Sequence, residues 1–325
     1  MKNVKRLVTA ATWSMVAALM LMASVSSVRA QEPEKAVRKD LVLRDDARCT
    51  RCHDAEDNPK ILEIGKSKHG VRGDARTPTC TSCHGESDAH VNNVRPAGSN
   101  ERPKPDRTFT KSSSTPPEER ADACLNCHRG TNRTHWQGSS HQANQVACSN
   151  CHTVHAAVDP VLQKKTQTQV CFACHREQRA DSLKISTHPV KEGKVVCSDC
   201  HNPHGSPGPS MVKKNTINET CHVCHAEKRG PFLWEHLPVA ENCANCHTPH
   251  GSNLAPLLVS RAPWLCQSCH DGQHSSENPV GRNAAGNQAG LTNQSPSNQA
   301  LGRACLNCHS VIHGSNSPNG GYFQR

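Results

Sequence analysis

Cysteine and histidine recur together through this chain in one fixed pattern. All 20 cysteines lie in pairs separated by two residues, and a histidine follows the second cysteine of every pair. This is the attachment signature of a c-type haem, in which each thiol adds to one vinyl group and the adjacent imidazole is held against the iron. The pattern therefore predicts ten covalent haems, each with a proximal histidine. The motifs are Cys49/Cys52/His53, Cys80/Cys83/His84, Cys124/Cys127/His128, Cys148/Cys151/His152, Cys171/Cys174/His175, Cys197/Cys200/His201, Cys221/Cys224/His225, Cys243/Cys246/His247, Cys266/Cys269/His270 and Cys305/Cys308/His309.

Zinc and thiol redox chemistry are the alternatives for paired cysteines, because CxxC pairs also hold tetrahedral zinc and form cytosolic redox motifs. Neither kind of site needs a histidine directly after the second cysteine in all ten motifs. No cysteine is left over for a disulfide or a free thiol. The histidines therefore favour haem over zinc.

Twelve of the 22 histidines lie outside the proximal position. Two of them are poorly placed as ligands: His222 is inside its own attachment loop, and His135 lies just upstream of the better-placed His141. The other ten would supply one distal ligand per haem, which predicts bis-histidine ligation throughout. Those that closely follow a motif are His90, His155, His204, His250, His274 and His313, and those that precede one are His69, His141, His188 and His236.

Methionine is the usual alternative sixth ligand, and it raises the reduction potential. Met211 is the only methionine after residue 30, so at most one haem can be ligated by histidine and methionine. Bis-histidine haems are low-spin and have comparatively low potentials. We therefore expect an electron-transfer protein working over a range of potentials, because neighbouring charged haems shift one another's values.

The order of motifs and histidines repeats along the chain. Segments 124–155, 171–204 and 221–250 each read motif, upstream histidine, motif, trailing histidine, and segment 49–90 is a stretched copy. If a trailing histidine ligates a different haem from the one its own motif holds, neighbouring haems are tied together into a chain. We expect this linkage, and ligand pairs drawn from single motif neighbourhoods would contradict it.

The spacing and composition limit the fold. From Cys124 to Cys266 the motifs start 22 to 26 residues apart, which leaves room for an attachment turn and a short helix. Hydrophobic residues are 34% of the chain and aromatic residues only 3%, too few for a conventional core of this size. Covalent haems would supply the apolar interior instead. Residues 92–120 and 275–303 are polar and are predicted to be loops, either solvated or used to dock a partner.

The first 30 residues predict export. Basic residues at the start precede an apolar run over 7–25, and the sequence Val28-Arg29-Ala30 follows, with small residues at positions 28 and 30, as in a cleaved secretory signal peptide. A retained membrane anchor is the alternative. No later stretch is apolar for long enough to span a bilayer.

The net charge of +10 raises the question of nucleic-acid binding. Four of the positive charges lie in the predicted signal, and the haems would add about twenty propionates, which outweigh the remainder. The basic residues are therefore read as propionate partners, and we expect no nucleic-acid partner.

Four segments closely resemble the DmsE/MtrA/PioA-type decahaem cytochromes: 197–206 (CSDCHNPHGS), 218–236 (NETCHVCHAEKRGPFLWEH), 261–270 (RAPWLCQSCH) and 305–325 (CLNCHSVIHGSNSPNGGYFQR). The resemblance extends over the chain after the signal in motif number, order and spacing. It implies an elongated multihaem cytochrome c fold, mostly irregular coil with short α-helices around a row of ten haems and almost no β-sheet. It also implies two pentahaem halves, 31–185 and 186–325, and bis-histidine ligation by the proximal and distal residues named above. The extra histidines His135 and His222 are minor departures from the family pattern.

The resemblance further implies a periplasmic protein that inserts into an outer-membrane β-barrel, porin-like partner. Electrons would pass between a periplasmic or inner-membrane cytochrome and the cell exterior, where an extracellular multihaem cytochrome is a further partner, in metal reduction or Fe(II) oxidation. A soluble periplasmic shuttle is the first alternative. A multihaem reductase is the second, but catalysis needs an open iron site, and the ten distal candidates argue against one. We therefore expect an electron carrier rather than an enzyme.

Overall fold

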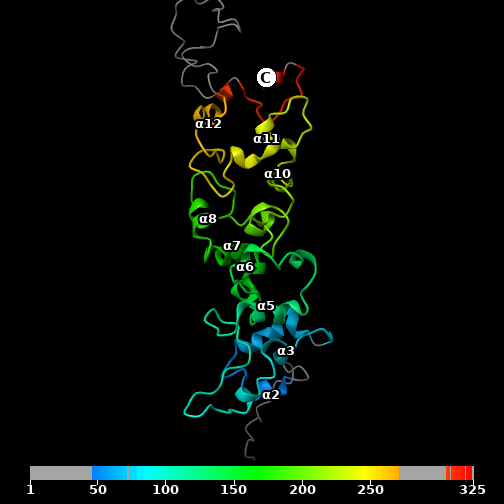
Figure 1. The fold of residues 1–325 in the computed structure, drawn as a ribbon, viewed down its shortest axis with the longest axis vertical. Coiled ribbons are helices and arrows are strands. Elements are labelled where there is room, and N and C mark those ends of the chain that lie inside the picture. The colour runs from blue at the N-terminus through cyan, green and yellow to red at the C-terminus, as the bar shows by residue number, and fades with distance from the viewer. Residues whose placement is uncertain (1–45, 72, 271–304, 308, 319, 324–325) are drawn as a thin grey trace, which may run out of the picture. The chain divides into compact units, whose positions relative to one another are not determined.

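The computed structural model describes residues 46–71, 73–270, 305–307, 309–318 and 320–323 (Figure 1). These residues belong to one compact unit. The predicted signal peptide, the second predicted loop, the candidate ligand His274 and the attachment residue Cys308 lie outside the described residues. The predicted division into halves after residue 185 stays a prediction.

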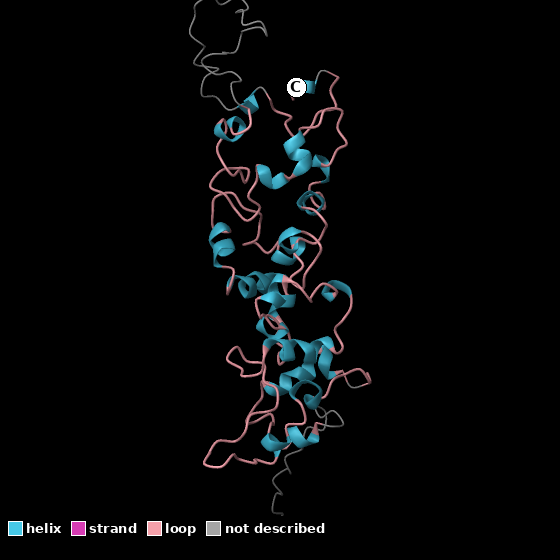
Figure 2. Cartoon of the chain, viewed as in Figure 1, coloured by secondary structure: helices cyan, strands magenta, loops and turns pink. Residues whose placement is uncertain are grey.

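Short helices joined by long irregular segments make up the described chain (Figure 2). The longest helices, α5 and α7, have 9 residues each. The described residues form no strand, only isolated bridges such as Ser186 with Ser252 and Trp234 with Ser315. This confirms the prediction of a mostly irregular chain with short helices and no sheet. The α-helices are α2 (Ala47–Thr50), α3 (Cys80–His84), α4 (Asp88–Val91), α5 (Pro117–Leu125), α6 (Ser140–Ala143), α7 (Lys164–Phe172), α8 (Arg176–Asp181), α9 (Cys197–Cys200), α10 (Ile217–Cys221), α11 (Leu237–Glu241) and α12 (Trp264–Gln267).

The remaining elements are 3-10 helices of three to six residues. They are η2 (Ile61–Lys66), η3 (Lys68–Gly70), η4 (Thr131–Arg133), η5 (Cys148–Asn150), η6 (Pro160–Leu162), η7 (Pro209–Met211), η8 (Ala226–Lys228), η9 (Cys243–Asn245), η10 (Cys305–Asn307) and η11 (Gly320–Tyr322). Helices this short are not stable in isolation, so contacts between distant segments must hold them. Within the described ranges, no helix has the length and hydrophobicity needed to cross a membrane.

A single helical turn forms at the CxxCH motifs. In motif 6, for example, the His201 N–H donates to the Cys197 carbonyl over 3.0 Å, and the equivalent bond in motif 3 joins His128 to Cys124 over 2.9 Å. Positions i, i+3 and i+4 share one helix face. The turn therefore directs both thiols and the imidazole of a motif to the same side, where one porphyrin can meet all three.

Side chains inside the motifs also cap these turns. The third residue of a motif accepts a hydrogen bond from the main-chain N–H just before the first cysteine. Asn150 does so for Ala147 over 2.9 Å, and Asp199 for Val196 over 2.9 Å. Polar residues between the paired cysteines thus stabilise the attachment turn.

The described residues contain almost no conventional core. The buried apolar side chains are Ala121, Trp136, Ala147, Val196 and Val212. Large apolar side chains such as Ile185, Leu237 and Trp264 are 86%, 68% and 65% exposed. This composition of the interior is the one expected of a chain that folds around apolar cofactors rather than around its own side chains.

Candidate haem-binding sites

The candidate ligands lie in facing pairs. Nine proximal histidines each face one predicted distal histidine, with ring centroids 5.9 to 6.3 Å apart. The two extra histidines, His135 and His222, belong to none of these pairs. The pairs are His53 with His90, His84 with His155, His128 with His69, His152 with His204, His175 with His141, His201 with His250, His225 with His188, His247 with His313 and His270 with His236.

The spacing within the pairs fits an iron atom between the rings. Rings stacked in direct contact would lie about 3.5 to 4 Å apart. Two metal–nitrogen bonds of about 2 Å, with about 1 Å more from each nitrogen to its ring centroid, require about 6 Å. The pairs therefore have the separation that bis-histidine ligation needs.

Each pair joins two different motifs. His204, which follows motif 6, faces His152 of motif 4, and His250, which follows motif 8, faces His201 of motif 6. A histidine that precedes an even-numbered motif instead faces the proximal histidine of the next odd-numbered motif. His141, which precedes motif 4, faces His175 of motif 5. This is the arrangement that the linkage hypothesis requires, because no pair is formed within one motif neighbourhood.

For the tenth proximal residue, His309, the predicted distal ligand is His274, which lies outside the described residues. The Nδ1 of His309 donates to the Tyr322 carbonyl over 2.6 Å. His309 therefore has the same kind of anchor as the paired histidines.

The first cysteines of an odd motif and the next even motif lie near each other. The neighbouring Cys148 thiol, together with burial, raises the pKa of the free Cys124 thiol, and Cys124 lowers the pKa of Cys148. Cys171 and Cys197 are related in the same way between motifs 5 and 6. The other neighbouring pairs are Cys49 with Cys80, Cys221 with Cys243 and Cys266 with Cys305.

The second cysteines make the alternate connections, from an even motif to the next odd one. Cys151 of motif 4 lies close enough to Cys174 of motif 5 for the two thiols to interact electrostatically. The same holds for Cys83 with Cys127, Cys200 with Cys224 and Cys246 with Cys269. From motif 1 to motif 10, each motif therefore has a cysteine near a cysteine of the next motif.

Cys52, the second cysteine of motif 1, differs from the second cysteines of motifs 2 to 9. The near neighbours among second cysteines begin at Cys83 and Cys127, and Cys52 is in none of these pairs. Cys52 is exposed, as are Cys127, Cys174, Cys200, Cys224 and Cys269. Its main-chain N–H still donates to the Cys49 carbonyl over 3.2 Å, within the attachment turn. Covalent attachment of a haem at Cys52 stays a prediction from the motif, and an exposed thiol is accessible for that bond.

The Nδ1 atoms of seven paired histidines are anchored to the main chain. A carbonyl oxygen can only accept, so the Nδ1 atom must carry the proton, and the Nε2 lone pair is left to bind a metal. Within the described ranges, the donor–acceptor pairs are His84 to Arg107, His90 to Pro103, His141 to Pro203, His155 to Ile61, His188 to Pro249, His201 to Ser210 and His247 to Pro256, over 2.6 to 3.0 Å.

Two of these anchors connect neighbouring sites. The His141 Nδ1 donates over 2.7 Å to the carbonyl of Pro203, the residue directly before the distal candidate His204. His188 makes the same bond over 2.8 Å to Pro249, directly before His250. One peptide segment thus positions two distal candidates that serve consecutive motifs.

Burial keeps several candidate ligands neutral. It lowers the pKa of His204 to about 4, with further lowering by His152 and Arg133. Burial likewise lowers the pKa of His84 and His250. A neutral imidazole is the form that binds a metal, so the protein environment favours ligation.

The first predicted loop is part of the site. Its Arg107 and Pro103 carbonyls accept from His84 and His90, and the Arg107 Nε donates to the Cys83 carbonyl over 2.7 Å. Most of residues 92–107 are exposed, so the segment is solvated as well as bonded to the site, and its use to dock a partner stays a prediction. The loop is shorter than predicted, because α5 begins at Pro117. Main-chain acceptors have no side-chain signature, so the sequence pattern could not identify this role.

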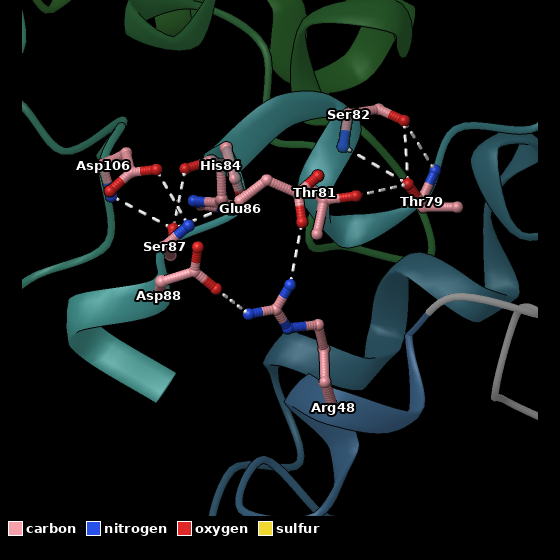
Figure 3. Close-up of polar contacts among 10 residues, drawn as sticks. Arg48, Thr79, Thr81, Ser82, His84, Glu86, Ser87, Asp88 and Asp106 are labelled. Carbon is pink, nitrogen blue, oxygen red and sulfur yellow. Dashed lines mark hydrogen bonds and ion pairs between the residues drawn. The ribbon is translucent and has the colours of Figure 1, made fainter. Parts of the chain in front are cut away.

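Polar side chains fasten the same region to motif 1 (Figure 3). The Ser87 N–H donates to Asp106 over 2.8 Å, and the Ser87 hydroxyl donates to the His84 carbonyl over 3.0 Å. Arg48, inside α2, forms ion pairs with Glu86 and Asp88. These contacts hold α4 beside motif 1, and α4 carries His90 to its partner His53.

Comparison with known proteins shows the family to which the chain belongs. Residues 188–230 and 236–275 match the family model of a doubled CXXCH motif, and residues 80–166 match that of NrfB-like cytochrome c-type proteins. The chain is 45% identical over 285 residues to the multihaem cytochrome MtrA of Shewanella baltica, a match covering 85% of this chain and 80% of the relative. It is 29% identical over 150 residues to the cytochrome c-type protein NrfB of Haemophilus influenzae, covering 40% of this chain and 65% of that relative. The chain therefore belongs to the family of the multihaem cytochrome MtrA, and it is an electron-transfer protein that binds several c-type haems through its CxxCH motifs.

Proposed function

We propose that this chain carries ten bis-histidine c-type haems and conducts electrons along them across the outer membrane, inside a β-barrel partner. On the inner side it exchanges electrons with a periplasmic or inner-membrane cytochrome, and on the outer side with an extracellular multihaem cytochrome or a metal. The proximal and distal ligands are the histidines paired above, with His309 and His274 as the tenth pair.

The observation that carries this proposal is the set of facing histidine pairs, each of which joins two different motifs, as His204 with His152 and His250 with His201 do. Cysteines of consecutive motifs also lie near one another, as Cys124 and Cys148 do and then Cys151 and Cys174. When bound, each haem supplies a one-electron Fe(III)/Fe(II) couple. The cysteines and histidines fix the order and spacing of these couples, and no bond needs to form or break when an electron moves between them.

The histidine pairs support electron transfer over catalysis. A reductase needs an open coordination position for its substrate. In the nine described pairs an imidazole lies on each side of the position an iron would take, at 5.9 to 6.3 Å between centroids. Both axial positions would therefore be filled.

The polarity of the chain supports a β-barrel partner, because a chain of this kind that crosses the membrane must be shielded from lipid. Long irregular segments expose main-chain groups that hydrocarbon cannot satisfy, and charged residues are 20% of the sequence. A closed barrel satisfies its own hydrogen bonds and can enclose a polar chain. The predicted export signal and the MtrA relative support a location on the periplasmic side of the outer membrane.

Cell fractionation with haem staining tests this proposal. We expect the haem-stained protein in outer membranes, protected from added protease and recovered in constant ratio with a β-barrel protein. Recovery only from the soluble periplasmic fraction, with no barrel companion, would contradict the conduit and favour the shuttle.

A further inference from the structure

The proximal histidine of motif 4 has a different anchor from the others. The His152 Nδ1 lies 2.7 Å from the Oδ2 of Asp159, a carboxylate, whereas the anchored histidines described above donate to main-chain carbonyls. In motif 7, Glu227 is the nearest parallel, but its Oε1 lies 3.8 Å from the His225 Nδ1, beyond hydrogen-bond distance. His152 therefore has a carboxylate, rather than a main-chain carbonyl, as the hydrogen-bond partner of its Nδ1 atom.

The Asp159 carboxylate is held in a fixed orientation. Its Oδ1 accepts from the Thr153 N–H over 3.2 Å and from the Val161 N–H over 3.3 Å, where it caps η6. The Asp159 side chain is only 15% exposed and that of His152 31% exposed. A carboxylate that is aligned and partly removed from water acts on its hydrogen-bond partner more strongly than a solvated one.

This bond changes the electron donation of the imidazole. A carboxylate draws the Nδ1 proton toward itself and gives the ring partial imidazolate character, which makes Nε2 a more basic ligand. A more basic ligand and a nearby negative charge both favour ferric over ferrous iron. We propose that Asp159 is a positioning residue which, through His152, lowers the reduction potential of the haem at motif 4 relative to its neighbours. This inference rests on the proposed ligation by His152 and His204.

The location of motif 4 gives this effect a consequence for electron flow. His152 of motif 4 faces His204, which follows motif 6, and His155, which follows motif 4, faces His84 of motif 2. Cys148 also lies near Cys124 of motif 3, and Cys151 near Cys174 of motif 5, so an electron that moves from motif to motif along the chain passes motif 4. One electron arrives from one neighbour and one leaves to the other, with no change in bonding. Asp159 makes the reduced state of the haem at motif 4 less favourable, so this haem stays oxidised in a partly reduced protein. The oxidised haem then separates reduced haems at motifs 1 to 3 from those at motifs 5 to 10.

The test is an EPR-monitored redox titration of the full holoprotein. In Asp159→Asn, the EPR signal of one low-spin haem is expected to shift in its g values. The reduction potential of that haem is expected to rise. Asp159→Glu keeps a carboxylate, so the reduction potential of the motif 4 haem in this variant is expected to stay below that in Asp159→Asn. Asp159→Ser keeps an oxygen able to cap η6 while removing the charge, so it is expected to shift the potential upward even if the Asn variant folds poorly.

Glu227→Gln is the matched control, because it removes a carboxylate that lies near the His225 Nδ1 but is too far away to hydrogen-bond it. It is expected to leave all g values unchanged. If Asp159→Asn or Asp159→Ser retains every low-spin haem with unchanged g values and potentials, the inference is overturned and the proposed function stands. If instead the wild-type protein lacks ten low-spin haems, the proposed function itself fails.

Discussion

The imidazole planes of His69 and His128 stand at 85° to each other, with centroids 5.9 Å apart. Those of His53 and His90 are almost parallel, at 7° and 6.1 Å. The angle between two axial imidazoles controls the splitting of the iron d orbitals. Perpendicular planes make two of these orbitals nearly equal in energy, whereas parallel planes separate them. The histidine pairs therefore predict more than one kind of haem in a single protein.

EPR spectroscopy of the oxidised protein checks this prediction. We expect a highly anisotropic low-spin signal from the His69/His128 pair together with rhombic low-spin signals from parallel pairs such as His53/His90. His69→Ala is expected to remove part of the anisotropic signal, and His90→Ala part of the rhombic signal. A single rhombic species in the wild-type protein would contradict the observed plane angles.

Replacing a distal histidine tests the pairing between motifs. His204→Met places a thioether opposite His152, and thioether ligation raises the reduction potential. Redox titration is expected to show one haem moving upward, with a methionine–iron charge-transfer band in the absorption spectrum. His135→Met is the control, because His135 belongs to none of the described pairs and its side chain is exposed. Equal effects of the two variants would count against the pairing.

A glycine beside a distal candidate is required by close packing. Gly251 follows His250 and has a φ of 152°, and a Cβ there would lie 2.0 Å from the Asp181 carbonyl oxygen. Gly251→Ala is therefore expected to cost more than about 2 kcal/mol of stability, because main-chain atoms must move. Gly138 is a matched control, since it also has a positive φ of 81° but has no atom within 4 Å of an added Cβ.

Thermal unfolding of the two holoproteins measures the difference. Gly138→Ala is expected to lower the stability by only about 1 kcal/mol, the cost of a left-handed conformation. A Gly251→Ala loss no larger than that of Gly138→Ala would show that the contact with Asp181 is not tight.

The loop over motif 2 makes a prediction about local stability. Arg107→Ala removes the 2.7 Å bond to the Cys83 carbonyl and loosens the segment that accepts from His84. We expect a loss of about 1 kcal/mol and faster hydrogen exchange around motif 2. Arg95→Ala provides the comparison, because the Arg95 side chain is exposed and donates only to Asn93. Similar exchange rates in both variants would show that the loop does not hold the site.

Most features that could be predicted from the sequence depend on residues that are close together along the chain. The CxxCH spacing is local, so the attachment turns and their shared face follow from helical geometry. Sorting histidines by distance from a motif selected the same residues that face each other in the described pairs, and their ligation of haem iron stays a prediction. The low apolar content predicted a chain without a conventional core, and the five buried apolar residues agree with it.

The pairing itself depends on contacts between distant residues. His155 faces His84 across 71 positions of the sequence, and nothing near either residue specifies the other. The anchors of the Nδ1 atoms are mostly main-chain carbonyls, which every residue possesses. Asp159 is a side-chain anchor, and it is seven positions after His152 in the sequence. That separation does not predict a contact, because the contact depends on the turn that brings the two residues together.

Electron transfer across a sealed membrane would show whether the chain acts as a conduit. The protein would be purified with its barrel partner and reconstituted into lipid vesicles that enclose a redox dye, and a membrane-impermeant reductant or oxidant would be added outside. The trapped dye is expected to change colour only in vesicles containing this chain with all its haems. No colour change with the intact complex, or an equal change with the barrel alone, would contradict the conduit.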